Sequence, residues 1–140
     1  MSDKFFLDTN IFVYSFDSRH PNKQKQAKDL IELALRDHRG IVSAQVIQEF
    51  MNAATGKFAT PLSQADCRSY LDAVLAPLCE IFPSLALYHE SLSIQEETGY
   101  SFYDALMITA ALAGQCRLLY SEDLQNNRKV RELTILNPFV

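Results

Sequence analysis

Short apolar runs alternate along this chain with longer segments in which apolar residues recur every three or four positions. The short runs predict strands at 4–7, 41–44, 80–82, 117–120 and 133–136. The periodic segments predict helices at 9–16, 21–38, 45–55, 64–76, 85–98 and 102–113. Strands separated by helices are typical of βαβ units. We therefore expect an α/β fold, with one domain over residues 1–140 and a mainly parallel sheet of about four to five strands, flanked by helices on both faces.

Carboxylates follow two of the predicted strands directly. Asp8 ends the run FFLD, and Ser121, Glu122 and Asp123 come after the strand at 117–120. Ligands of open α/β sheets bind beyond the carboxyl ends of the strands, so both groups lie where a site is expected. Asp8 also has a structural explanation, because an aspartate at this point can cap the following helix.

Two further acids stand on predicted helices. Glu49 lies off the apolar stripe of the helix at 45–55, and periodicity alone predicts that its side chain is solvated. Asp104 stands in the first turn of an apolar helix, where a negative charge suits the helix dipole. Neither residue indicates a site by itself.

Four segments taken together resemble the PIN-domain family. They are FFLDTNI (5–11), SAQVIQEF (43–50), SFYDALMITAAL (101–112) and LLYSEDL (118–124). They occur in the order of the family and cover nearly the whole chain. Asp123 fits the Ser-x-Asp frame of the last segment best, and the adjacent Glu122 is the alternative fourth acid.

The resemblance implies a metal-dependent ribonuclease. Its catalytic acids are expected to be Asp8, Glu49, Asp104 and Asp123, with Asp8 and Asp104 as the direct or water-bridged ligands of Mg²⁺ or Mn²⁺. Crowded carboxylates raise each other's pKa unless a cation balances them, and Mg²⁺ prefers oxygen ligands. Asn10 and Ser121 are candidates for holding the carboxylates by hydrogen bonds. The alternative for these two residues is ordinary hydrogen bonding in turns.

Charge is unevenly distributed. The formal net charge of −4 does not favour nucleic-acid binding, but basic residues cluster at both ends of an acidic middle. We expect these residues to contact RNA phosphates; they are Lys23, Lys25, Lys28, Arg128, Lys129 and Arg131. The alternative is that the first cluster is only the solvated face of a helix.

Many small PIN proteins are toxins of VapC-type pairs, so the resemblance suggests a cognate antitoxin and a homodimer. Two alternatives remain: a PIN nuclease that processes RNA without a toxin role, and a PIN-fold binding module without catalysis. No apolar run approaches a membrane span, and Asp3 and Lys4 interrupt any signal peptide. Three widely spaced cysteines fit a reducing compartment, so we expect a cytoplasmic protein with no membrane association.

Overall fold

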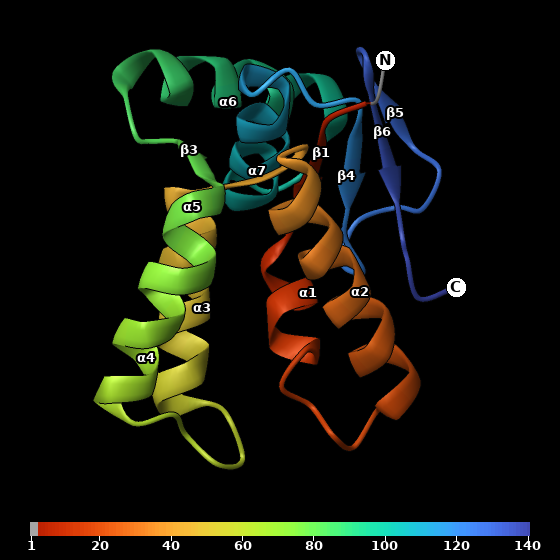
Figure 1. The fold of residues 1–140 in the computed structure, drawn as a ribbon. Coiled ribbons are helices and arrows are strands. Elements are labelled where there is room, and N and C mark those ends of the chain that lie inside the picture. Colours follow the sequence, from red (N-terminus) through yellow and green to blue (C-terminus); the bar gives the residue numbers. More distant parts are fainter. Residues whose placement is uncertain (1–2) are drawn as a thin grey trace.

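The computed structural model describes residues 3–140. Its sheet has six strands in the order β3-β2-β1-β4-β6-β5 (Figure 1). The strands are β1 (Phe5–Leu7), β2 (Gly40–Ser43), β3 (Cys79–Ile81), β4 (Leu118–Tyr120), β5 (Lys129–Val130) and β6 (Leu133–Leu136). All neighbouring strands are parallel except β5 and β6. The predicted α/β class with a mainly parallel sheet is confirmed.

The helices follow the predicted order. They are α1 (Thr9–Tyr14), α2 (Pro21–Asp37), α3 (Ala44–Gly56), α4 (Gln64–Tyr70), α5 (Ala76–Leu78), α6 (Leu85–Thr98) and α7 (Phe102–Ala113). Side-chain caps explain several starts: Ser63 accepts a hydrogen bond from the Asp66 N–H, and Ser84 accepts one from the Leu87 N–H. Among residues 3–140, no helix is both long and apolar enough to cross a membrane.

The single helix predicted at 64–76 is wrong in detail. A π-helical turn, η1 (Leu71–Leu75), interrupts it, and the helix resumes as α5 up to Leu78. Pro77 gives a physical reason, because a proline has no N–H for the usual bond to the preceding turn. The backbone widens just before it, where the Ala76 N–H donates to the Leu71 carbonyl.

The sixth strand, β5, was not predicted. It has only two residues, of which Val130 is buried, and it joins β6 through a tight turn at Arg131 and Glu132. Arg131 adopts a left-handed backbone conformation with φ 54°, which a bulky residue rarely does. Two residues are too few to show the alternation that predicts a strand.

The strand order explains where a site forms. The chain moves from β1 to β2 and β3 on one side, then crosses back to place β4 on the other side of β1. The carboxyl ends of β1, β2 and β4 therefore share one edge, and the order reverses between β1 and β4. Right-handed crossovers in opposite directions put α2 and α7 on opposite faces of the sheet.

Aromatic packing fixes the helices that surround this edge. Phe12 of α1 contacts Phe50 of α3 edge to face, and both side chains are fully buried. Phe50 also stacks on Tyr70 of α4, with ring centroids 4.9 Å apart. Such pairs stabilise a core beyond the area that they bury, by about 0.5–1.5 kcal/mol each. They hold α1, α3 and α4 together as one unit beside the sheet edge.

Candidate active site

Asp8 lies at the carboxyl end of β1, where it is 7% exposed. One carboxylate oxygen accepts a hydrogen bond from the Thr9 N–H at 2.6 Å, as the residue caps α1. The other accepts one from the Ser121 hydroxyl at 2.6 Å. Burial, with smaller contributions from the charges of Asp123 and Glu49, raises the pKa of Asp8 to about 7 against the opposing effect of these hydrogen bonds.

Asp123 follows β4 on the same edge of the sheet. Its Oδ2 accepts a hydrogen bond from Asn10 Nδ2 at 3.2 Å, and its backbone N–H donates to the Ser121 hydroxyl at 3.2 Å. Ser121 therefore joins Asp8 to the loop that carries Asp123. The alternative fourth acid, Glu122, instead accepts hydrogen bonds from Tyr14 and Lys23.

Glu49 reaches the same region from α3. Its two carboxylate oxygens accept hydrogen bonds from the Thr9 hydroxyl at 2.6 Å and from Gln45 Nε2 at 3.0 Å. The side chain is half-buried, so the expectation of a solvated residue from periodicity does not hold. Sequence reasoning missed both donors. Gln45 precedes Glu49 by four residues on one helix face, and that spacing is a signal that it could contact the carboxylate.

Asp104 stands in the first turn of α7, as predicted. It is half-buried, and its backbone N–H donates to the Ser101 hydroxyl that caps the helix. Its connection to the other acids is indirect: Gln45, the partner of Glu49, also donates to the carbonyl of the adjacent Tyr103 at 3.2 Å. Among residues 3–140, no three His, Cys, Asp or Glu side chains form a ready-made metal cluster.

The donor set nevertheless suits a hard cation. None of the ion pairs between described residues includes Asp8, Glu49, Asp104 or Asp123. Within the same residues, the buried Oδ1 of Asn10 has no hydrogen-bond partner. Carboxylate and amide oxygens are the ligands that Mg²⁺ and Mn²⁺ prefer. A cation would offset the burial and repulsion that oppose ionisation of Asp8.

The basic residues expected to contact RNA are mostly engaged with protein groups. Lys23 pairs with Glu122 at 2.6 Å, Lys25 with Asp29 at 3.0 Å, and Arg131 with Glu90 and Glu97 at 2.6 and 3.1 Å.

Arg128 donates to the carbonyl of Thr98 at 2.8 Å and lies over the Tyr100 ring. Lys28 and Lys129 are exposed, and neither forms an ion pair with another described residue. These two are the best remaining candidates for contacting phosphates.

Comparison with known proteins matches the PIN domain family model to residues 5–132. Three solved structures share the fold. A toxin-antitoxin complex from Klebsiella pneumoniae is 16% identical with a TM-score of 0.66, over 96% of this chain and 98% of that chain. VapBC2 from Rickettsia felis, bound to a DNA fragment from its promoter, is 21% identical with a TM-score of 0.62, over 94% and 96%. VapC20 from Mycobacterium tuberculosis, a sarcin-ricin loop cleaving toxin, is 19% identical with a TM-score of 0.59, over 86% and 90%. Among curated proteins, none matches this sequence.

Proposed function

Since the chain belongs to the PIN-domain family, we propose that it is a Mg²⁺- or Mn²⁺-dependent endoribonuclease that hydrolyses RNA phosphodiester bonds. The observation that carries the proposal is the buried Asp8 carboxylate at the switch point of the sheet. It is joined through Ser121 to the loop of Asp123, and through Thr9 to Glu49, without an ion pair to any described residue. A buried carboxylate without a cationic partner indicates a functional site more often than a stabilising one.

Asp8 and Asp104 would hold the cation, while Glu49 and Asp123 complete the acidic pocket. When bound, the cation supplies a Lewis acid that stabilises negative charge on the phosphodiester. Thr9 and Gln45 orient the two oxygens of Glu49, which leaves that carboxylate able to position a water molecule as general base. Ser121 and Asn10 keep Asp8 and Asp123 on one edge of the sheet.

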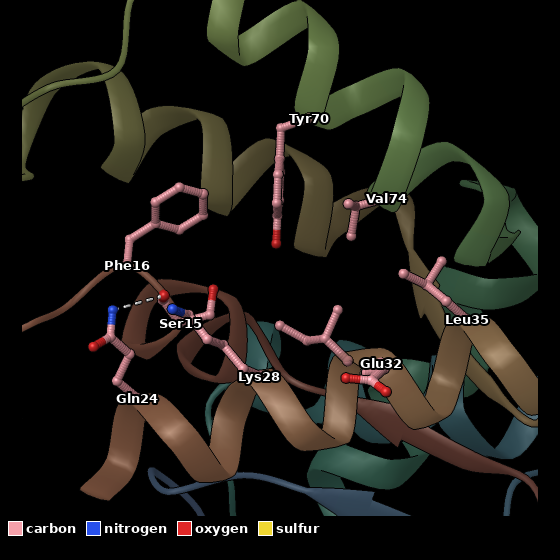
Figure 2. Close-up of a pocket in the computed structure, with 9 residues that line it drawn as sticks. Ser15, Phe16, Gln24, Lys28, Glu32, Leu35, Tyr70 and Val74 are labelled. Carbon is pink, nitrogen blue, oxygen red and sulfur yellow. Dashed lines mark hydrogen bonds between the residues drawn. The ribbon is translucent and has the colours of Figure 1, made fainter. Parts of the chain in front are cut away.

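We further propose that the protein is a toxin inhibited by a cognate antitoxin, and a groove beside the end of α1 supports this. The groove is a cavity of about 480 Å³, in which Tyr70 and Val74 face Leu35 of α2 and Phe16 stands at one end (Figure 2). Most of the exposed lining is apolar, and the charged side chains of Lys28 and Glu32 also line it. An apolar helix or strand of an antitoxin fits such a groove. The groove begins at the end of α1, and Asp8 caps the start of this helix, about 10 Å away.

A homodimer is proposed on a different surface. Three large apolar side chains of α6, Leu85, Tyr88 and Leu92, are 78%, 37% and 54% exposed and recur at helical spacing on one face. Phe82 and Tyr103, outside α6, are also exposed, at 64% and 68%. A second copy of this chain would remove this apolar face from water. The three thiols are free, which agrees with action in the cytoplasm.

The first experiment is cleavage of labelled single-stranded RNA by the purified protein, with Mg²⁺, with Mn²⁺ and with a chelator. Asp104→Asn is the test variant, and Asp72→Asn, an exposed acid away from the site, is its control. Cleavage that requires metal and is lost only in Asp104→Asn supports the nuclease. Mn²⁺ binding without cleavage of single-stranded, transfer or ribosomal RNA supports a binding module instead.

The toxin role needs a separate test. Expression of the wild type is expected to stop bacterial growth, and co-expression of the small protein encoded directly upstream is expected to restore it. Asp8→Asn is the control, since it should leave growth unaffected. Normal growth on expression of an active nuclease would support an RNA-processing enzyme with no toxin role.

A further inference from the structure

Three consecutive residues after β4 point to two different places. Ser121 and Asp123 face the acidic site, where they contact Asp8 and Asn10. Glu122, between them, turns away to Tyr14 and Lys23, at 2.6 Å from the Tyr14 hydroxyl and 2.6 Å from Lys23 Nζ. The loop is therefore held on one side by the site and on the other by this cluster, named here the Glu122 clamp (Tyr14, Lys23 and Glu122).

Helix α1 provides a partner for both sides of the loop. Asn10 and Tyr14 are four residues apart, so their side chains project from the same face of the helix. Asn10 contacts Asp123, and Tyr14 contacts Glu122. Two successive hydrogen bonds thus dock the loop along α1. The Asp123 side chain takes part in only one of them, the 3.2 Å bond from Asn10, and the other acts on the loop through Glu122.

Lys23 closes the clamp from α2. Its ammonium group also lies 3.3 Å from the Tyr14 hydroxyl, 4.8 Å from the Tyr14 ring centroid and 5.7 Å from that of Phe139. The side chains of Lys23 and Glu122 are 34% and 25% exposed, so the pair is shielded more than an ordinary surface ion pair. Charge-assisted hydrogen bonds of this kind are short and directional, which suits them to fixing a loop.

Asp123 needs such support because it is an exposed loop residue. The acidic site requires a defined carboxylate position, yet exposed loops are mobile unless a rigid scaffold holds them. Helices α1 and α2 are that scaffold here. Lys23 is then occupied by Glu122 and two aromatic rings, an arrangement that sequence reasoning, which assigned it to RNA, did not anticipate.

We propose that Tyr14, Lys23 and Glu122 are positioning residues, which hold Asp123 in place for the reaction, and that Lys23 acts through Glu122 instead of binding RNA phosphate. This inference rests on the proposed nuclease function for its catalytic consequence. The docking of the loop itself is independent of that function. The two are therefore tested by different measurements.

The variants are Lys23→Met and Glu122→Gln, alone and combined, with Lys57→Met and Glu132→Gln as exposed controls. Either clamp variant is expected to lower Mn²⁺ affinity and kcat at saturating metal by about 10-fold or more, as loss of an outer partner does at other metal sites. The double variant is expected to lose no more Mn²⁺ affinity or kcat than either single variant, because both substitutions remove the same ion pair. The salt dependence of RNA binding should not change, and the controls should match the wild type.

Hydrogen exchange of the Asp123 amide is the measurement that does not depend on activity. This N–H donates to the Ser121 hydroxyl, so release of the loop should accelerate its exchange in both clamp variants. Tyr14→Phe removes only the hydroxyl, and it replaces the other variants if Lys23→Met or Glu122→Gln impairs folding. We expect it to accelerate exchange of the Asp123 amide to a smaller extent. Acceleration in these variants but not in the controls supports the clamp.

Two results would overturn the inference. The first is that Lys23→Met reduces the slope of log binding constant against log salt concentration for RNA by about 0.7, while Glu122→Gln retains full activity. Lys23 would then be a phosphate ligand. If exchange of the Asp123 amide is unchanged in both variants, the clamp does not hold the loop. A wild type that neither binds Mn²⁺ nor cleaves RNA would refute the proposed function, and amide exchange would still decide the clamp.

Discussion

Replacing Asp8 by asparagine is expected to stabilise the fold, by an amount that grows as the pH rises from 5 to 8. The substitution keeps the shape of the side chain and removes its charge. The amide oxygen can still accept from the Thr9 N–H, and the amide N–H₂ can donate to the Ser121 hydroxyl, whose direction of donation simply reverses. Both polar atoms of the new amide therefore keep a hydrogen-bond partner.

The magnitude follows from the raised pKa of Asp8. Its folded value is about 7 against 3.8 for the unfolded reference, so the folded state binds the proton more tightly. The carboxyl contributes its full stability below pH 3.8, and this contribution is lost as the pH rises through 7. The difference between the two pKa values corresponds to about 4 kcal/mol, which is a large part of the stability of an ordinary domain.

The assay is urea unfolding of the wild type and Asp8→Asn at pH 5, 6, 7 and 8 in chelator, followed by circular dichroism. The difference between their free energies of unfolding should be smallest at pH 5. At pH 8 the variant should be more stable by up to about 4 kcal/mol. Asp72→Asn, an exposed carboxylate, is the control and should track the wild type at every pH. A gap at pH 8 below about 1 kcal/mol, or one of equal size at pH 5, would refute the reasoning about a buried, uncompensated charge.

Metal provides a second arm of the same experiment. Mn²⁺ added at pH 8 should raise the unfolding free energy of the wild type by binding only its folded state, and should stabilise Asp8→Asn less. Equal stabilisation of both proteins would mean that Asp8 does not hold the cation.

Three further predictions test other parts of the molecule. Gln45→Met removes a donor to Glu49 and should lower RNA cleavage about 10-fold with little change in unfolding free energy, whereas the exposed Gln48→Met should do neither. Gly40→Ala brings a methyl group against Ala34 and should cost about 1–3 kcal/mol in urea unfolding, while Gly56→Ala, which meets open space, should not. Combined Lys28→Gln and Lys129→Gln should flatten the logarithmic salt slope of RNA binding by about 1.4; an unchanged slope would remove both residues from the RNA interface.

Local pattern was enough for most of the secondary structure. The buried run that forms β1 and the capped starts of α4 and α6 depend on neighbours within a few residues, so composition and spacing predict them. The exceptions have physical causes. The two-residue β5 exists because β6 pairs with it, and the π turn before Pro77 depends on a missing N–H, which no periodicity reports.

Some residues of the candidate site were predictable from the sequence, and others were not. Asp8 and Asp123 were predictable as residues that follow strands, because ligands gather at the carboxyl ends of parallel strands. Glu49 was not predictable from its helix, since the decisive contact comes from Thr9, 40 residues earlier in the chain. Periodicity describes only which face of a helix is apolar, and it does not show which polar group another element brings to the opposite face.

The sequence alone therefore determined the order of the elements and the strand ends at which acids occur. Only the tertiary structure decided which charges meet. Lys23 and Glu122 are 99 residues apart, and we propose that their pairing supports the Asp123 loop. The physical reason is that secondary structure follows from short-range sterics and burial, whereas the partner of a charge depends on which strands the fold makes neighbours.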